Sequence, residues 1–132
     1  AAFGIRYATV VHPSAYVAEG VMTGRGTMVG PGTMIAAGTV FDGQALVNRG
    51  VMIGHHVYIE KYVTISPGVN IAGRVRIGEG SYIGMGAIIL DGINIGTNSV
   101  VGAGALVTHD VPDSVQVMGL PARIVKSLDN NP

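Results

Sequence analysis

The chain has 132 residues with 8 basic and 8 acidic side chains, so its formal net charge is zero and no charge excess directs it to nucleic acid or to an anionic membrane. It contains no cysteine, which excludes disulfides and thiolate metal sites. It has no apolar run long enough for a membrane span and no signal-peptide pattern. The length indicates one domain, and we expect a cytoplasmic protein.

Residues 1–10 form a lead-in, and a strict six-residue repeat then occupies residues 11–108. Valine or isoleucine fills fifteen of the seventeen positions that follow one another at six-residue spacing from Val11 to Val107. The phase never slips, so this span contains no insertion. Such a period is typical of a solenoid, in which each unit buries its apolar side chains against copies of itself.

Two further columns of the repeat describe a short strand followed by a corner. A small or β-branched residue stands four positions after each aliphatic one, and Gly recurs three positions after it, as at Gly20, Gly26 and Gly32. Glycine adopts a positive φ without steric cost, as a tight corner requires. Side chains alternate along a strand, so the aliphatic and small residues both face inward. The sequence therefore predicts an all-β parallel β-helix with its core column running from Val11 to Val107.

Residues 109–132 leave the repeat and form a C-terminal tail. Pro112, Pro121 and Pro132 exclude one long helix in this segment, because proline interrupts a helix interior. The chain ends in a polar stretch, residues 129–132, which we expect to be frayed.

The hexapeptide repeat resembles that of the left-handed parallel β-helix, in which three units make one triangular coil of eighteen residues. On that resemblance, residues 11–108 give a little over five coils, and residues eighteen apart stack on one side. One outward stack is largely apolar and consists of Tyr16, Met34, Met52, Asn70, Ile88 and Leu106. A continuous apolar column is typical of an interface. Since β-helices of this kind form trimers, the resemblance implies a homotrimer with this stack near the seam.

The clearest break in the repeat is the adjacent pair His55 and His56. His56 occupies the column that is usually Gly, and His55 stands at the outward corner beside it. By the eighteen-residue stacking, His55 has Ala37 one coil before it and Gly73 one coil after it, which leaves open space for a ligand. Histidine also tolerates a positive φ as an ordinary corner residue, but two adjacent histidines favour a functional role for His55.

The residues around this pair resemble those of bacterial hexapeptide-repeat sugar acetyltransferases. This group includes the sialic-acid O-acetyltransferases and the UDP-4-amino-sugar N-acetyltransferases. The resemblance covers essentially the whole chain. Its motifs, in chain order, are His12 to Ala15, Asn48 to His56, Ile71-Ala72-Gly73, Ile77 to Gly80, Val111-Pro112, and Gly119 to Ala122. Many acyltransferases share the hexapeptide repeat. The spacing of Asn48 from His55, together with Ala72-Gly73, narrows the resemblance to the sugar acetyltransferases.

The resemblance implies an acetyl-CoA-dependent acetyltransferase that acts on the amine or hydroxyl of a sugar or nucleotide sugar in glycan biosynthesis. UDP-4-amino-sugar N-acetylation is the main expectation, and sialic-acid O-acetylation is the alternative. His55 is implied as the general base, with His56 beside it as the second catalytic residue, and Asn48 as a residue that holds the acceptor sugar. The residues implied along acetyl-CoA are Gly73, Thr64 and Ala103. The pantetheine would run between two neighbouring β-helices, and no metal is implied.

Three features depart from the family pattern. The family usually has Asp or Glu where this chain has His56, which supplies no negative charge. Many members have a second histidine near the thioester where this chain has Thr64, whose backbone amide is expected to serve instead. Full-length members carry an N-terminal Rossmann-like domain for the sugar nucleotide. This chain begins at the β-helix, so we expect an excised domain, a natural short form or one part of a larger enzyme.

Two other classes compete with this interpretation. The γ-class carbonic anhydrases share the fold and bind zinc through three histidines, but no pair among His12, His55, His56 and His109 has the spacing of their paired ligands. Adjacent His55 and His56 are expected to point in different directions from the corner. A β-helix without activity, used as a scaffold or an oligomerisation module, is the second alternative, and failure to bind acetyl-CoA would favour it.

Overall fold

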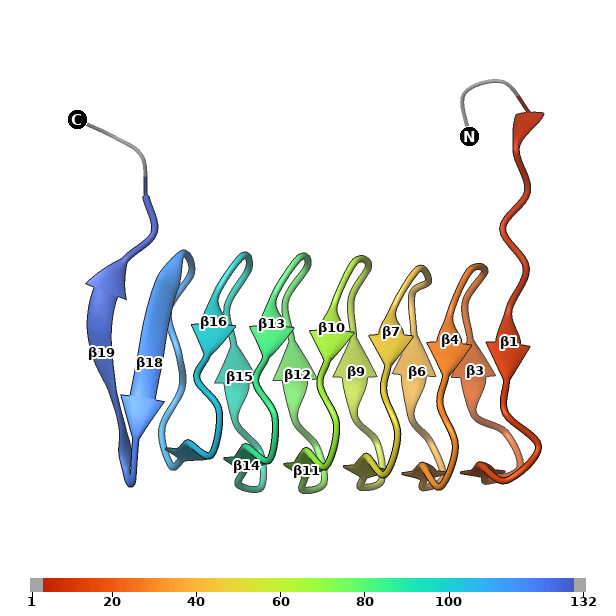
Figure 1. The fold of residues 1–132 in the computed structure, drawn as a ribbon, viewed down its shortest axis with the longest axis horizontal. Helices are drawn as coiled ribbons and strands as arrows, with labels where there is room; N and C mark the ends of the chain where they lie inside the picture. The colour runs from red at the N-terminus through yellow and green to blue at the C-terminus, as the bar shows by residue number, and fades with distance from the viewer. Residues whose placement is uncertain (1–3, 130–132) are drawn as a thin grey trace.

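The computed structural model describes residues 4–129, which form a solenoid built from three β-sheets (Figure 1). Sheet A contains β1 (Val10–Val11), β4 (Met28–Val29), β7 (Leu46–Val47), β10 (Thr64–Ile65), β13 (Tyr82–Ile83), β16 (Val100–Val101), β18 (Val115–Gly119) and β19 (Ala122–Ser127). Sheet B contains β2 (Tyr16–Val17), β5 (Met34–Ile35), β8 (Met52–Ile53), β11 (Asn70–Ile71), β14 (Ile88–Ile89) and β17 (Leu106–Val107). Sheet C contains β3 (Met22–Thr23), β6 (Val40–Phe41), β9 (Tyr58–Ile59), β12 (Arg76–Ile77) and β15 (Asn94–Ile95).

Strands eighteen residues apart pair in parallel on every side of the solenoid. Tyr58 lies opposite Arg76 in sheet C, and Asn70 lies opposite Ile88 in sheet B. In Figure 1 the chain descends on the near side, crosses underneath and climbs on the far side while it advances from right to left, which makes the coil left-handed. The predicted left-handed parallel β-helix with an eighteen-residue coil is therefore confirmed. We name the turns between sheets the AB, BC and CA corners.

The core is the predicted column of Val and Ile side chains. Buried members run from Val29 to Val107, and the isoleucines from Ile59 to Ile89 are at most 1% exposed. The first coil differs from the prediction, because Val11 is 39% exposed and Val17 and Thr23 are only half-buried. These side chains lie at the end of the solenoid, where no preceding coil covers them.

The corner column has the positive φ that its glycines predicted. Every glycine of that column has φ between 64° and 82°, and five of the residues that replace glycine there keep the same conformation. The replacements are Gln44 (φ 49°), His56 (φ 53°), Tyr62 (φ 62°), Arg74 (φ 57°) and Asn98 (φ 51°). They lie only at BC and CA corners, whereas at the AB corners the column has glycine from Gly32 to Gly104 and, in the first coil, Ser14 without a positive φ.

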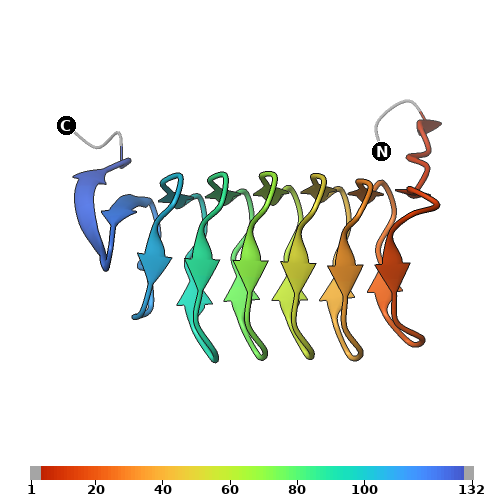
Figure 2. The ribbon, with the colours of Figure 1, turned by 60° about the horizontal axis from the view of Figure 1, so that its bottom comes forward.

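A β-hairpin covers the C-terminal end of the solenoid. Strand β18 pairs in parallel with β16 and antiparallel with β19, so the tail contains no long helix, as its prolines predicted. Val111 and Val117 are buried and continue the inward column, but they lie opposite Ile95 and Val101 at an offset of sixteen residues instead of eighteen. The lead-in and the hairpin occupy opposite ends of the molecule (Figure 2). None of the residues 4–129 belongs to a helix that could cross a membrane.

The substitution Ile77→Asp should prevent folding. The Ile77 side chain is fully buried between neighbouring coils, so its loss removes about 1.5–3 kcal/mol of burial. The unpaired carboxylate adds a desolvation penalty of several kcal/mol, against a total stability of about 5–15 kcal/mol for an ordinary domain. Circular dichroism and soluble yield measure the outcome. Ile88→Asp, at an outward position that is 44% exposed, is the matched control and should retain the β-helix. A soluble, folded Ile77→Asp protein would contradict the inward column.

Candidate functional site

The two adjacent histidines lie at the BC corner between β8 and β9. His55 stands at the exposed tip of the corner, and His56 takes the left-handed position with φ 53°. The buried Thr39 of the preceding coil braces this corner from inside. Its hydroxyl donates a hydrogen bond to the Gly54 carbonyl at 2.9 Å and accepts one from the Val57 amide at 3.3 Å. The backbone on both sides of the histidines is therefore fixed by a residue of the neighbouring coil.

Small residues above and below the corner make room for both imidazoles. A Cβ added to Gly73 would lie 2.6 Å from Nε2 of His55, and one added to Gly38 would lie 2.6 Å from Nε2 of His56. The His55 ring therefore lies against the following coil and the His56 ring against the preceding one. The predicted position of Gly73 beside His55 is confirmed, because any side chain at residue 73 would collide with the ring.

The two imidazoles also contact each other. Their Nδ1 atoms are 3.0 Å apart and their rings meet edge-on, with centroids 5.3 Å apart and an interplanar angle of 83°. The Nε2 tips point toward opposite coils, as expected of adjacent corner residues, but the Nδ1 atoms meet. A hydrogen bond between two ring nitrogens holds one proton, so one Nδ1 donates and the other accepts. The Nε2 atom of the donating ring is then left with a free lone pair.

An apolar groove on sheet B begins beside this corner. It has a volume of about 350 Å³, and its outer rim carries Met34 and Met52, which are each 48% exposed. The remaining lining residues are Tyr16, Ile35, Ala36, Ile53, Gly54, Asn70, Ile71 and Ala72. Gly54 precedes His55 and Ala72 precedes Gly73 in the chain. The groove thus joins the imidazole corner to the outward stack on sheet B, and it suits a flexible, mostly apolar ligand arm.

The other predicted site residues lie away from His55 within one chain. Asn48 is at an AB corner, where its side-chain amide donates to the Ile65 carbonyl at 3.1 Å. Ala103 is exposed at the AB corner three coils later. Thr64 faces outward on sheet A, and its backbone amide donates to the Ser81 carbonyl at 3.0 Å. The expected use of that amide as a ligand donor is therefore wrong, because the sheet already occupies it, and only the Thr64 hydroxyl remains.

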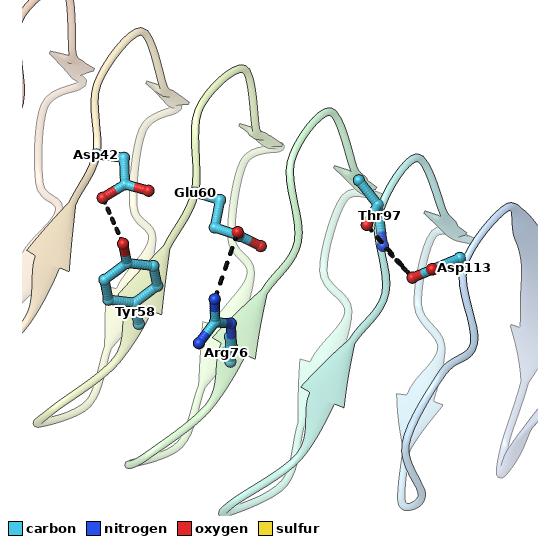
Figure 3. A network of polar contacts seen from close by, with 6 residues as sticks. All are labelled: Asp42, Tyr58, Glu60, Arg76, Thr97 and Asp113. Carbon is cyan, nitrogen blue, oxygen red and sulfur yellow. Dashed lines mark hydrogen bonds and ion pairs between the residues drawn. The ribbon is translucent and has the colours of Figure 1, made fainter.

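A polar network on sheet C was not predicted from the sequence. The Tyr58 hydroxyl donates to Oδ1 of Asp42 at 2.6 Å, and this hydrogen bond to a carboxylate raises the pKa of the Tyr58 phenol (Figure 3). The Arg76 guanidinium lies 4.8 Å from the centroid of the Tyr58 ring and 3.4 Å from Glu60. Residues eighteen apart stack in the repeat, so the sequence held the signal for the Tyr58 and Arg76 pair. Among residues 4–129, no group of three or more His, Cys, Asp or Glu side chains is arranged to hold a metal ion.

Both the repeat and the stacked coils of this chain resemble those of known proteins. Residues 74–109 match the family model described as bacterial transferase hexapeptide (six repeats). No curated protein matches the chain in a sequence search. The solved structures that resemble it include the acetyltransferase domain of PglB from Neisseria gonorrhoeae in complex with acetyl coenzyme A, which is 34% identical over 92% of this chain with a TM-score of 0.90.

Two further structures are similar over nearly the whole chain. PerB from Caulobacter crescentus, in complex with CoA and GDP-perosamine, is 35% identical over 93% of this chain with a TM-score of 0.91. WeeI from Acinetobacter baumannii is 31% identical over 92% of this chain with a TM-score of 0.85. The chain spans 59–60% of the length of these three proteins. It is therefore a hexapeptide-repeat β-helix that is similar over nearly its whole length to the acetyltransferase domain of PglB and to PerB.

Proposed function

We propose that the chain is the transferase domain of an acetyl-CoA-dependent sugar acetyltransferase. The observation that supports this most is the placement of His55, an exposed imidazole held against Gly73 at the edge of an apolar groove. The ligands follow from similar structures, in which PglB binds acetyl coenzyme A and PerB binds CoA and GDP-perosamine. The main proposed acceptor is the amine of a nucleotide-activated sugar, namely a UDP-4-amino-sugar. The alternative acceptor is a hydroxyl of sialic acid. The same proposal places the enzyme in the cytoplasm.

The chemical step is an acyl transfer with His55 as general base. The acceptor nitrogen attacks the thioester carbonyl, Nε2 of His55 takes the proton from that nitrogen, and the carbon–sulfur bond breaks as the amide forms. The proton then passes from His55 to the departing CoA sulfur, so the histidine returns to its starting state. The Gly73 amide donates to no acceptor within residues 4–129 and is available to the developing oxyanion or to the acetyl-CoA arm.

His56 holds His55 in the form that this step needs. If the Nδ1–H of His55 donates to Nδ1 of His56, the lone pair of His55 lies on Nε2, the atom beside Gly73. A carboxylate at residue 56 would fix the same tautomer and would also stabilise the imidazolium that forms during transfer. His56 supplies only the first of these effects. We therefore assign His56 a positioning role with less electrostatic assistance than an acidic residue gives.

We propose a homotrimer in which sheet B of one copy packs against sheet A of the next. Both sheets carry columns of exposed apolar side chains, among them Met28 and Leu46 on sheet A and Met52 and Ile88 on sheet B. Sheet C carries the polar network and, in its first strand, the exposed Met22. At the AB corners between the two apolar sheets every residue with a positive φ is glycine, so that position carries no side chain at a shared axis. This packing buries the apolar columns and would close the groove on sheet B.

The same packing would place the separated site residues along one seam between two copies. The BC corner with His55 and Gly73 would face a neighbour that presents Thr64 from sheet A. Asn48 would lie at the end of the seam nearest the shared axis, where its side-chain oxygen is available to a ligand because its amide nitrogen donates to the Ile65 carbonyl. Ala103, whose backbone amide donates to no acceptor within residues 4–129, would bind along acetyl-CoA. Both ligands then lie between copies, and a separate copy has an incomplete site.

The direct test is a transfer assay with acetyl-CoA and a panel of acceptors, namely UDP- and GDP-linked 4-amino-sugars and free sialic acid. Release of the CoA thiol together with the mass of an acetylated nucleotide sugar would support the proposal. If sialic acid is the only acceptor that is acetylated, the group that the enzyme acetylates is a hydroxyl and not an amine. A protein that binds no acetyl-CoA in calorimetry would instead be a scaffold, and the acetyltransferase assignment would be wrong.

The substitution His55→Ala should lower kcat by about 10²–10⁴, because general base catalysis contributes roughly that factor. Acetyl-CoA should still bind, since the apolar groove is unchanged. His12→Ala, at an exposed histidine of the first AB corner, is the matched control and should keep full activity. Unchanged kcat in His55→Ala with an established acceptor would place the base elsewhere.

Substitutions at residue 56 should separate positioning from electrostatic assistance. His56→Ala should cost less activity than His55→Ala, because the His55 ring loses only its partner. His56→Asp should raise kcat above wild type, because a carboxylate would both accept from Nδ1 of His55 and stabilise its charged form. Steady-state kinetics of the two variants measures this. Equal losses in both variants would show that residue 56 is needed as an imidazole.

The double substitution Met52→Lys with Ile88→Lys should split the trimer without unfolding the coils. Both side chains are exposed in one chain, at 48% and 44%, so lysine is tolerated by the fold but not by an apolar interface. Sedimentation velocity should show a trimeric mass for the wild type and a monomeric mass for the variant, with the same circular dichroism. A wild-type chain that is monomeric at micromolar concentration would refute the proposed assembly.

A further inference from the structure

The CA corners carry a column of charges that reverses sign halfway along the solenoid. We call the second residue after the sheet C strand the tip of its corner. From the first corner to the last, the tips are Arg25, Gly43, Lys61, Glu79, Thr97 and Asp113. Backbone hydrogen bonds stack them in one line, since the Gly80 amide donates to the Lys61 carbonyl and the Ser114 amide to the Thr97 carbonyl. The four charged tips are exposed, whereas Gly43 is buried and Thr97 is half-buried.

None of the charged tips has an ionic partner within residues 4–129. The ion pair of that part of the chain joins Arg76 and Glu60, which lie on sheet C beside the tips. Asp42, the other acid near the cationic tips, accepts the hydrogen bond of the Tyr58 hydroxyl (Figure 3). The acids that flank the tips therefore have partners of their own, and the four tip charges face solvent.

The two halves of this edge have opposite charge. Arg25 and Lys61 line a pocket of about 380 Å³ together with Arg6 of the lead-in, so the N-terminal half is positive. Glu79 and Asp113 make the C-terminal half negative. Oδ1 of Asp113 accepts a backbone amide of the preceding coil at 2.7 Å, and its second oxygen has no hydrogen bond within residues 4–129. The tips thus read plus, neutral, plus, minus, neutral, minus, an order that is complementary to itself when one copy is turned end to end.

Antiparallel contact of two such edges would pair every charged tip with an opposite charge. A two-fold axis between the third and fourth corners sets the first corner of one copy against the sixth of the other, and the third against the fourth. Arg25 would then face Asp113 of the second copy, and Lys61 would face its Glu79. A two-fold contact repeats each pair, so the edge would form four ion pairs. With strands about 4.8 Å apart, these pairs extend over roughly 24 Å.

The column beside the tips fits the same arrangement. Tyr62 has φ 62° at a corner position where glycine has no steric cost, and its side chain is 55% exposed. The two-fold axis would set its ring against Gly80 of the second copy, where the side-chain oxygen of Asn98 lies over the glycine. A bulky residue at a positive φ persists where another requirement maintains it. Core packing is not that requirement, because the Tyr62 ring is exposed.

We propose that the edge formed by the CA corners is a binding surface for the same edge of a second copy, in antiparallel orientation. The inference goes beyond the proposed function and does not depend on it. In the trimer proposed above, the CA corners lie at the outer ends of the seams, so the edge stays accessible. One edge covers much less than the roughly 800 Å² per partner of a stable interface. The association is therefore weak, and salt abolishes it because exposed ion pairs are screened.

Sedimentation velocity of the concentrated chain tests the pairing directly. The experiment compares about 0.01 M salt with about 1 M salt, because the Debye length falls from about 30 Å to about 3 Å between them. At low salt the wild type should form a species larger than its basic oligomer, and at high salt that species should disappear. Absence of the larger species at low salt would overturn the proposal. A larger species that persists at high salt would place the contact on an apolar surface and would also overturn it.

Charge reversal at the centre of the edge identifies the contact. Lys61→Glu and Glu79→Lys should each abolish the larger species, because either change sets like charges opposite each other twice. The double variant with both changes restores opposite charges and should associate as the wild type does. Arg123→Glu on the exposed hairpin and Glu19→Lys at an exposed BC corner change the net charge by the same amounts. These two controls should associate normally, and their failure to do so would show an effect of net charge alone.

Mixing the two single variants separates contact between copies from an effect within one chain. Lys61→Glu presents acids at both central positions, and Glu79→Lys presents lysines at both. Neither variant should associate alone, but an equimolar mixture should form the larger species. Residues 61 and 79 are neighbours in one chain, and a change confined to that chain cannot produce association only on mixing. A mixture that stays unassociated would refute the pairing.

Tyr62→Gly tests the role of the ring. The substitution restores the residue that the corner favours, so the melting temperature should be unchanged or higher, while the larger species should decrease. Retained stability with weaker association would show that residue 62 serves the contact. Unchanged association would contradict the fit of the Tyr62 ring against Gly80 of the second copy.

Discussion

The parallel pairing of residues eighteen apart is the constraint on which the rest of this structure depends. A strand of two residues cannot support itself, and its backbone groups find their partners in the neighbouring coils, as when the Met52 amide donates to the Val69 carbonyl at 2.9 Å. Side chains follow the same rule, since each inward isoleucine packs on its equivalents above and below. Stability is therefore shared between neighbours. The first coil, which has a neighbour on one side only, leaves Val11 exposed, while the hairpin of β18 and β19 covers the other end.

This register also determines where chemistry can be added. Inward positions are filled by the core, and outward positions of the strands form the three faces, so the corners are the places where single residues can change without disturbing their neighbours. From the second coil on, the AB corners have glycine at the positive-φ position, whereas several BC and CA corners carry other residues there, among them His56, Arg74 and Tyr62. The glycine positions of the AB corners suit close approach of another copy. These two corners carry the histidine pair and the cations Arg25 and Lys61.

Much of this arrangement follows from the period in the sequence. Six-residue spacing predicts the core column, and an eighteen-residue coil predicts that Gly73 lies beside His55, because the backbone alone determines both. The contact between the two Nδ1 atoms depends on side-chain torsions that the period does not specify. The buried Val111 and Val117 escaped prediction because a corner shortened by two residues breaks the phase after Val107. The pocket lined by Arg6, Arg25 and Lys61 was not predicted because Arg6 lies outside the repeat, although Tyr62 in a glycine column was a visible signal.

The uniform stacking of coils also fixes the spacing between features along the axis of the solenoid. Adjacent strands are separated by about 4.8 Å, so a feature on one coil stands from a feature on another at a whole multiple of that step. His55 and Lys61 belong to one coil, while Arg25 lies two steps toward the N-terminus. Gain or loss of a complete coil between two features would change their separation by one step and preserve every corner angle. The binding groups that a long ligand meets along the axis are therefore separated by whole multiples of this step. The protein can match the length of such a ligand only in discrete increments.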